Sequence, residues 1–238
     1  MKGREVTSFR RTAARANYLS LDRADIQFAV KEICRGMANP TKGDGRKLRR
    51  LGRYLKDSPR CVMEYPYQGV VEELSGYSDS DWAGCRRTAK STSGGAIMRG
   101  AHCLKTWAAT QKNITLSSGE AELVAAVKMS TELIGVLQLA EEWGLKLSGQ
   151  VYVDSSAALG VVKRRGNGKM RHIRIGMLWV QEKSQSGELG YSKVAGEANP
   201  ADLMTKYLGR KTVDALLERL GVRRQGGRAD TSLQLASY

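Results

Sequence analysis

The order of hydrophobic patterns after Val70 limits the fold more than any other feature of the sequence. Three segments of strand-like composition follow one another, and then come a long helical pattern, a strand, a helix and a last strand. This succession is typical of an α/β protein in which helices flank one sheet. We predict strands at 70–82, 94–99, 103–107, 151–154 and 189–194, and helices at 117–143, at 155–163 and from 199 onward.

Two of these helices carry recognisable start signals. Ser117, followed three residues later by Glu120, predicts a capping box, and Gly144 predicts the end of the same helix. Asn199 is the expected N-cap of the late helix, with Pro200 at its first position.

The segment 19–57 has a helical pattern throughout. Its apolar residues recur at helical spacing on both sides of a break at 39–43, so two helices are expected. Pro66 and Gly69 then mark a boundary. We therefore predict a small N-terminal helical segment at 1–66, an α/β domain at 70–222, and a disordered tail at 223–238, where periodicity is lost.

The charge of the chain points to a polyanionic partner. The 238 residues have a formal net charge of +15, and so large a surplus repels itself unless an anion is bound. Residues 1–60 hold sixteen Lys or Arg against six acids, and 163–174 holds six with no acid. The segment 64–81 between them is acidic. Basic flanks around an acidic pocket are typical of a metal-dependent nuclease.

Several classes of protein are disfavoured. The sequence has no uninterrupted run of about 18 apolar residues and no apolar secretory leader, so we expect no membrane partner and no secretion. Four cysteines without a CxxC motif and only two histidines argue against a zinc site or a disulfide framework. We expect reduced thiols in a cytoplasmic or nuclear protein, and no small-molecule organic cofactor.

Four carboxylates lie at positions from which they could bind one metal site together. Asp79 lies in the first strand, Glu122 in the first turns of the long helix, Asp154 at the end of an apolar strand, and Asp202 at the start of the late helix. An acid at the end of a buried strand needs a cation to offset its desolvation. Alternatives stay open for three of these positions. Asp79 and Asp81 share a strand face, so either could be the ligand. Asp154 could be a turn or N-cap residue, and Asp202 could be only a favourable charge in the first turn of its helix.

Oxygen ligands with little His or Cys select Mg²⁺ or Mn²⁺. Two such ions can activate a water on one side of a phosphodiester and stabilise the leaving oxygen on the other. We assign no catalytic role to Glu120, because the predicted capping box explains it.

A series of short motifs covers about 70–222. They are GYSDSDWAG at 76–84, KSTSG at 90–94, WAATQK at 107–112, LSSGEAE at 116–122, YVD at 152–154, RHI at 171–173 and ADLMTK at 201–206. In this order they resemble the ribonuclease H domain of copia-type LTR retrotransposon Pol polyproteins. The resemblance implies the ribonuclease H-like fold, a mixed five-stranded sheet with flanking helices. Segments upstream of 57 resemble the C-terminal helical end, thumb or connection, of the adjoining reverse transcriptase.

Carried over by position, the family's metal-binding and catalytic acids fall on Asp79, Glu122, Asp154 and Asp202. The chain departs from the family at Cys85, where an acid is usual, and in 171–178, which lacks a second histidine. The loop 195–198 also lacks the histidine of cellular ribonucleases H.

The resemblance implies endonucleolytic, two-metal-ion cleavage of the RNA strand of an RNA/DNA hybrid, with the rest of the reverse transcriptase as a partner and a virus-like particle or the nucleus as the location. Two alternatives stay open: a catalytically inactive nucleic-acid-binding or structural module from a decayed copy, and another nuclease of this fold such as an integrase or resolvase. The candidates for contacts to nucleic acid are Ser118, Ser156, Lys169, Arg171, His172 and Arg174.

Overall fold

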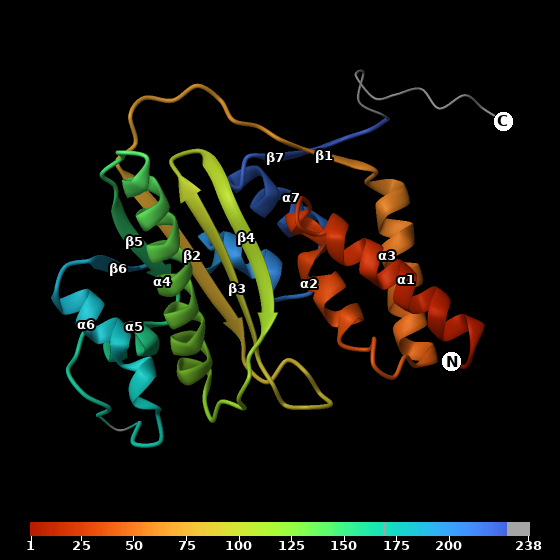
Figure 1. The fold of residues 1–238 in the computed structure, drawn as a ribbon, viewed down its shortest axis with the longest axis horizontal. Helices are drawn as coiled ribbons and strands as arrows, with labels where there is room; N and C mark the ends of the chain where they lie inside the picture. The colour runs from red at the N-terminus through yellow and green to blue at the C-terminus, as the bar shows by residue number, and fades with distance from the viewer. Residues whose placement is uncertain (169, 228–238) are drawn as a thin grey trace.

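A computed structural model describes residues 1–168 and 170–227 of the chain. Its centre is a five-stranded sheet in the order β4-β3-β2-β5-β6. The pairs β2–β3 and β3–β4 are antiparallel, whereas β2–β5 and β5–β6 are parallel (Figure 1). The predicted mixed five-stranded α/β sheet is therefore confirmed. The strands are β2 (Glu73–Asp81), β3 (Thr92–Arg99), β4 (His102–Thr110), β5 (Ser148–Val153) and β6 (Leu189–Lys193).

Helices cover both faces of this sheet. On one face the long α4 places Met129 and Leu133 against the strands, together with Val151 and Val153 in one buried cluster. On the other face η3 and α7 pack over Ala96 in a second cluster. The helices are α4 (Ser118–Glu142), α5 (Ser156–Val162), η1 (Ile175–Met177), α6 (Trp179–Gln185), η2 (Gly196–Ala198), η3 (Pro200–Met204) and α7 (Arg210–Arg219).

By length and composition alone, α4 is apolar enough to cross a membrane. The sequence argument from an uninterrupted apolar run did not detect this property. In the fold, α4 is the central helix of the core, and its residues Leu123, Met129 and Leu133 are fully buried against the sheet.

Three helices form the N-terminal unit: α1 (Arg4–Leu19), α2 (Ala24–Cys34) and α3 (Lys42–Asp57). They share a small core that includes Phe9, Ile26 and Leu51. Thr41 caps α3 with a capping box to Asp44. This unit contacts the sheet through α2, where Gln27 Nε2 donates a hydrogen bond to Thr106 Oγ1 of β4 at 2.9 Å.

A second, two-stranded sheet joins the segment after the N-terminal helices to the last described strand. β1 (Arg60–Met63) pairs antiparallel with β7 (Val222–Gln225), so that Cys61 lies opposite Arg224. The prediction of disorder for 223–238 was therefore wrong for 223–225, because backbone pairing with β1 orders them. Residues 228–238 of that predicted tail lie outside the described part of the chain.

Candidate active site

Strand geometry places two of the predicted acids side by side. Asp79 lies in β2 and is 1% exposed. Asp154 directly follows β5, which runs parallel to β2 with Val153 opposite Ser78. Because parallel neighbours end at the same edge of a sheet, the two carboxylates meet there.

Glu122 reaches the same point from the second turn of α4. Its Oε1 accepts the backbone N–H of Ser80 at 3.2 Å. Its Oε2 is buried and has no hydrogen-bond partner among the residues described. One carboxylate oxygen from each of Asp79, Glu122 and Asp154 lies within 4.8 Å of the other two. Three elements distant in sequence thus deliver three acids to one place.

Two acids of this cluster, Glu122 and Asp154, have raised pKa values. Burial raises the pKa of Glu122 to about 9, and the charges of Asp79 and Asp154 add to the effect. Burial, followed by the charge of Asp79, also raises the pKa of Asp154. Desolvation and mutual repulsion both penalise the carboxylate form, and a cation between the oxygens would offset both.

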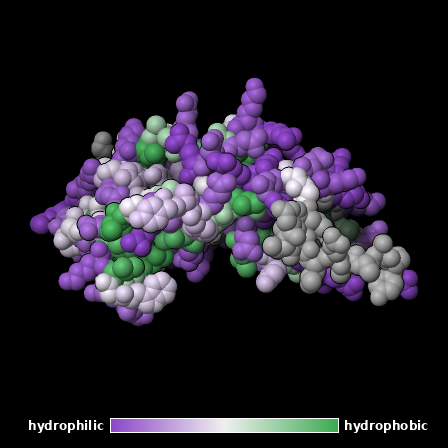
Figure 2. Space-filling model, turned by 90° about the horizontal axis from the view of Figure 1, so that it is seen from above, coloured by the Kyte–Doolittle hydropathy of each residue, from purple (hydrophilic) through white to green (hydrophobic). Residues whose placement is uncertain are grey.

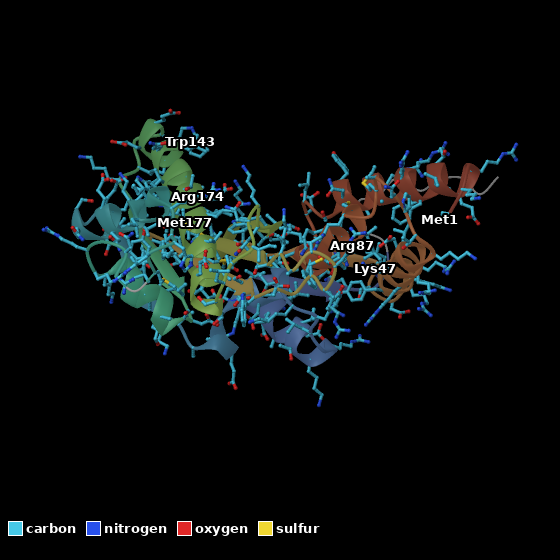
Figure 3. The ribbon with its side chains drawn as sticks, turned by 90° about the horizontal axis from the view of Figure 1, so that it is seen from below. Met1, Lys47, Arg87, Trp143, Arg174 and Met177 are labelled. Carbon is cyan, nitrogen blue, oxygen red and sulfur yellow. The ribbon has the colours of Figure 1, made fainter. Side chains whose placement is uncertain are left out.

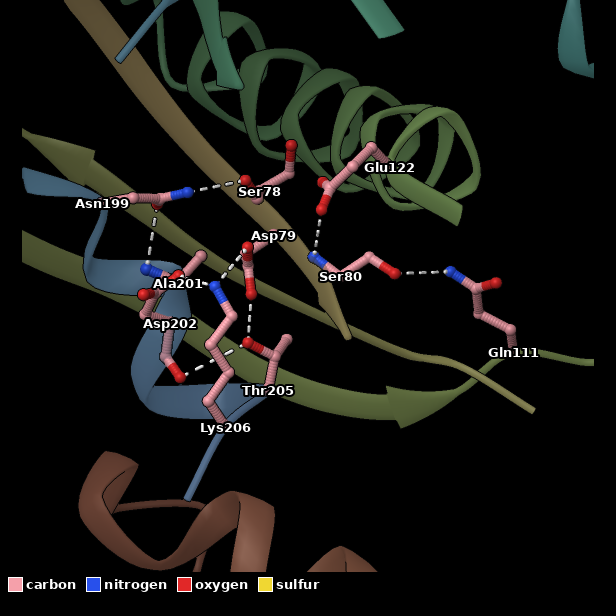
Figure 4. A network of polar contacts seen from close by, with 10 residues as sticks. All are labelled: Ser78, Asp79, Ser80, Gln111, Glu122, Asn199, Ala201, Asp202, Thr205 and Lys206. Atoms are coloured by element: carbon pink, nitrogen blue, oxygen red, sulfur yellow. Dashed lines mark hydrogen bonds and ion pairs between the residues drawn. The ribbon is translucent and has the colours of Figure 1, made fainter. Parts of the chain in front are cut away.

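Asp202 is connected to the cluster through a lysine. Lys206 Nζ donates to Asp79 Oδ1 at 3.1 Å and to Asp202 Oδ1 at 2.7 Å (Figure 4). Burial lowers the pKa of this ammonium, but the two carboxylates outweigh burial and raise it above its usual value. Burial and the charge of Asp79 raise the pKa of Asp202 to about 6. Asp202 is therefore linked to Asp79 through the ammonium group of Lys206, and it is not part of the three-acid cluster.

The segment that carries Asp202 is fixed to the sheet by side chains that the sequence did not mark as functional. Thr205 Oγ1 donates to Asp79 Oδ2. Asn199 Nδ2 donates to the carbonyl of Ser78 at 2.9 Å, and its Oδ1 accepts the N–H of Ala201, which confirms the predicted cap (Figure 4). Thr205 and Lys206 fall in the ADLMTK motif, which could have drawn attention to both.

The neighbouring acids have other partners. Asp81 accepts the backbone N–H of Thr92. Glu120 accepts the N–H of Leu116 at 2.7 Å and contacts His172 Nε2 at 3.1 Å. Only half of the predicted capping box is present, because Ser117 accepts from Glu120 N while the Glu120 carboxylate turns to Leu116.

The predicted nucleic-acid contacts that the structure describes are exposed side chains. Ser118 and Ser156 are exposed at the starts of α4 and α5, and Ser156 accepts from Lys193 Nζ at 2.7 Å. Arg171, His172 and Arg174 are also exposed. His172 and Arg174 border a groove between β4 and α4 that Lys112, Lys128 and Gln111 also line. Lys169 lies outside the described residues.

The donor set fits a divalent cation. The cluster offers carboxylate oxygens alone, which is the ligand type that Mg²⁺ and Mn²⁺ prefer. Glu122 Oε2 is a buried acceptor without a hydrogen-bond donor in the described part of the chain, so a ligand position is free to bind a cation.

Known proteins resemble this chain over most of its length. It is 30% identical over 221 residues, 92% of its length, to the retrovirus-related Pol polyprotein from transposon RE1 of Arabidopsis thaliana. It is 29% identical over 203 residues to the corresponding polyprotein from transposon TNT 1-94 of Nicotiana tabacum. These relatives are retrovirus-related Pol polyproteins from copia-type transposons, and the chain is similar to one part of them. It spans about 15% of the length of each of these two polyproteins.

The family relationship confirms the resemblance inferred from the motifs. No protein-family model matches the chain. Among solved structures, an LC11 ribonuclease H1 isolated from compost overlaps 61% of this chain and 99% of its own, with 17% identity and a TM-score of 0.42. The strand order, and not this likeness, establishes the mixed five-stranded α/β sheet. The roles of the individual site residues stay predictions.

Proposed function

We propose that this chain is the ribonuclease H unit of a copia-type Pol polyprotein and hydrolyses the RNA strand of an RNA/DNA hybrid with divalent metal. One observation carries the proposal: Asp79, Glu122 and Asp154, from three separate elements, place oxygens within 4.8 Å of one another in a family of reverse-transcribing elements. Three carboxylates so close together destabilise the fold by desolvation and mutual repulsion, so a purely structural role does not explain them.

The proposed metal ligands are Asp79, Glu122 and Asp154, with Asp202 as the fourth acid. Two Mg²⁺ or Mn²⁺ ions held there would supply the activation of water and the stabilisation of the leaving oxygen. The chain itself supplies orientation. Ser80 N–H fixes one oxygen of Glu122, and Thr205 and Lys206 fix both oxygens of Asp79. Such preorganisation limits the reorganisation needed when substrate binds.

The rim supports a nucleic-acid substrate. Arg171 and Arg174 are exposed cations beside α4, and Ser118 and Ser156 sit at two helix starts next to the acids. Hybrid duplexes are recognised through phosphates and RNA 2′-hydroxyls, which charged and hydroxyl side chains can contact. We further propose that residues 1–66 continue the reverse transcriptase, which would be the natural partner in a cytoplasmic particle or in the nucleus.

The test is cleavage of a labelled RNA/DNA hybrid by the purified full chain in Mg²⁺ and in EDTA. Asp154→Asn should abolish metal-dependent cleavage, whereas Asp81→Asn should retain it, because Asp81 bonds Thr92 and not the cluster. Binding without cleavage by the unmodified chain would overturn the proposal and favour the inactive binding module.

A further inference from the structure

A buried glutamine stands at the start of the connection between β4 and α4. Gln111 directly follows β4 and is 5% exposed. Its backbone N–H donates to the carbonyl of Ser91 at 2.8 Å, which holds the residue against the segment before β3. The side-chain amide is therefore presented from a fixed backbone.

The amide of Gln111 links three elements of the candidate active site. Its Nε2 donates to the Ala121 carbonyl at 2.9 Å, to Ser93 Oγ at 2.9 Å and, at the longer distance of 3.3 Å, to Ser80 Oγ (Figure 4). A carbonyl can only accept a hydrogen bond, so the contact to Ala121 decides which end of the amide faces these groups. One side chain thus connects α4, β3 and β2.

Two of these partners are neighbours of the clustered acids. Ala121 immediately precedes Glu122 in α4, and Ser80 immediately follows Asp79 in β2. The backbone N–H of Ser80 also donates to Glu122 Oε1 at 3.2 Å. Gln111 therefore joins the two backbone segments that carry Glu122 and Asp79.

The rest of α4 is held to the sheet by apolar packing. Leu123, Met129 and Leu133 are fully buried there. On the face seen from above, hydrophilic side chains cover most of the surface, and hydrophobic areas form only small patches (Figure 2). Apolar contacts are non-directional, whereas a hydrogen bond has a preferred distance and angle. The bond from Gln111 to Ala121 therefore adds a directional restraint one residue before Glu122.

The burial of Gln111 favours a role inside the protein over contact with a substrate. Gln111 lines a groove that Arg174 and Met177 border, and these two residues lie beside α4 when the molecule is seen from below (Figure 3). The Oε1 atom of Gln111 is buried and has no hydrogen-bond donor among the residues described. A molecule in the groove would therefore reach little of this amide.

We infer that Gln111 is a positioning residue, which holds the start of α4 where Glu122 can share a divalent cation with Asp79 and Asp154. The inference rests on the proposed function for the nature of the bound ion. The oxygens of the three acids lie within 4.8 Å of one another only while α4 and β2 keep their relative position. Groups that orient metal ligands from outside the coordination shell typically contribute about 10- to 100-fold in metal affinity or activity.

The test compares two buried glutamines in the full chain, through Gln111→Met and the matched control Gln27→Met. Gln27 is 7% exposed, its Nε2 donates to the Ser20 carbonyl and to Thr106, and its Oε1 likewise has no donor in the described part of the chain. Calorimetry measures Mn²⁺ binding, and melting curves in EDTA measure stability. Cleavage of an RNA/DNA hybrid at saturating Mg²⁺ gives kcat and KM.

Both variants should lose a similar amount of thermal stability in EDTA, because each replaces a buried amide by an apolar side chain of similar length. Gln111→Met should bind Mn²⁺ about 10-fold more weakly and lower kcat by a similar factor, with KM and the Mn²⁺ affinity of Gln27→Met changed less than about 2-fold. Gln111→Asn, a milder change, takes its place if Gln111→Met does not fold, and it is then compared with Gln27→Asn.

An unchanged Mn²⁺ affinity in the Gln111 variant would overturn the inference, as would an equal loss in the Gln27 variant. If the unmodified chain binds Mn²⁺ but cleaves no hybrid, and only the Gln111 variant loses affinity, the inference stands and the proposed nuclease activity fails. Absence of Mn²⁺ binding by the unmodified chain would overturn both.

Discussion

Gly94 is the strand partner of Asp79 across β2 and β3, and η3 packs directly over it. A Cβ atom at Gly94 would lie 2.7 Å from Thr205 Cγ2 and 3.0 Å from the carbonyl oxygen of Ala201. The absence of a side chain at Gly94 therefore lets Thr205 and Lys206 approach Asp79.

Gly94→Ala should push η3 away from the sheet. We expect a loss of roughly 1–3 kcal/mol in the free energy of unfolding, typical of overpacking, and a cleavage rate reduced by more than about tenfold. Thermal unfolding and hybrid cleavage measure the two effects. The matched control is Gly135→Ala on α4, where nothing lies near the added atom, and stability should stay the same or rise.

Glu122→Gln should stabilise the metal-free protein at alkaline pH. The pKa of Glu122 is about 9 in the fold, against roughly 4.3 in an unfolded chain. Between these values the folded state holds a proton that the unfolded state has released, so stability falls as pH rises. The amide removes this dependence, and it should raise the free energy of unfolding by about 1–3 kcal/mol at pH 8.

We expect Mg²⁺ to raise the melting temperature of the unmodified chain, because a ligand that binds only the folded state stabilises it, and we expect Glu122→Gln to lose this stabilisation. Melting curves in EDTA and in Mg²⁺ at several pH values measure both effects. If Glu122→Gln has a lower melting temperature than the unmodified chain at pH 8 in EDTA, the pKa of Glu122 is not raised in the fold.

Lys206→Met should tighten the binding of divalent cations. The ammonium of Lys206 occupies oxygens of Asp79 and Asp202 that an added ion would otherwise contact. Without it, we expect about tenfold stronger binding of Mn²⁺ by calorimetry, and a less stable metal-free protein because two buried acids repel each other. Lys183→Met is the control, since Lys183 pairs with Glu188 on the surface. An unchanged Mn²⁺ affinity would show that the lysine does not compete with metal.

Truncation after Leu220 should loosen the N-terminal helices. It removes β7 and with it Arg224, which donates to Ser58 at 3.2 Å and lies over the ring of Tyr54. We expect faster hydrogen exchange in α2 and α3, with less change in α4, whose contacts are to the sheet and to α5. Unchanged exchange in α3 would mean that the β1–β7 pair is dispensable.

The four candidate acids were selected from local signals in the sequence. Asp154 ends an apolar strand, Glu122 follows a helix cap, and Asp202 follows Asn199 and Pro200. The five strands of the main sheet were predicted for the same reason, with boundaries that differ by a few residues. The family motifs then selected Asp79 over Asp81, and the structure places Asp79 with Glu122 and Asp154.

What could not be predicted depends on contacts between distant residues. The place of Lys206 between two acids follows from the packing of η3 over Gly94, more than one hundred positions earlier in the chain. β1 and β7 are four-residue strands without an apolar alternation, and only their pairing defines them. The bounds of α1, α6 and α7 were not predicted, although α1 lies inside the segment 1–66 that was expected to be helical.

The pairing of β1 with β7 has a consequence for limited proteolysis of the chain. The connection at 64–72 is the covalent link between the helical unit and the sheet domain, yet β1, on the helical side, also bonds to the last described strand. A protease that cut this connection would nick the molecule without releasing either half. Separation of the two halves would also require the hydrogen bonds between β1 and β7 to break.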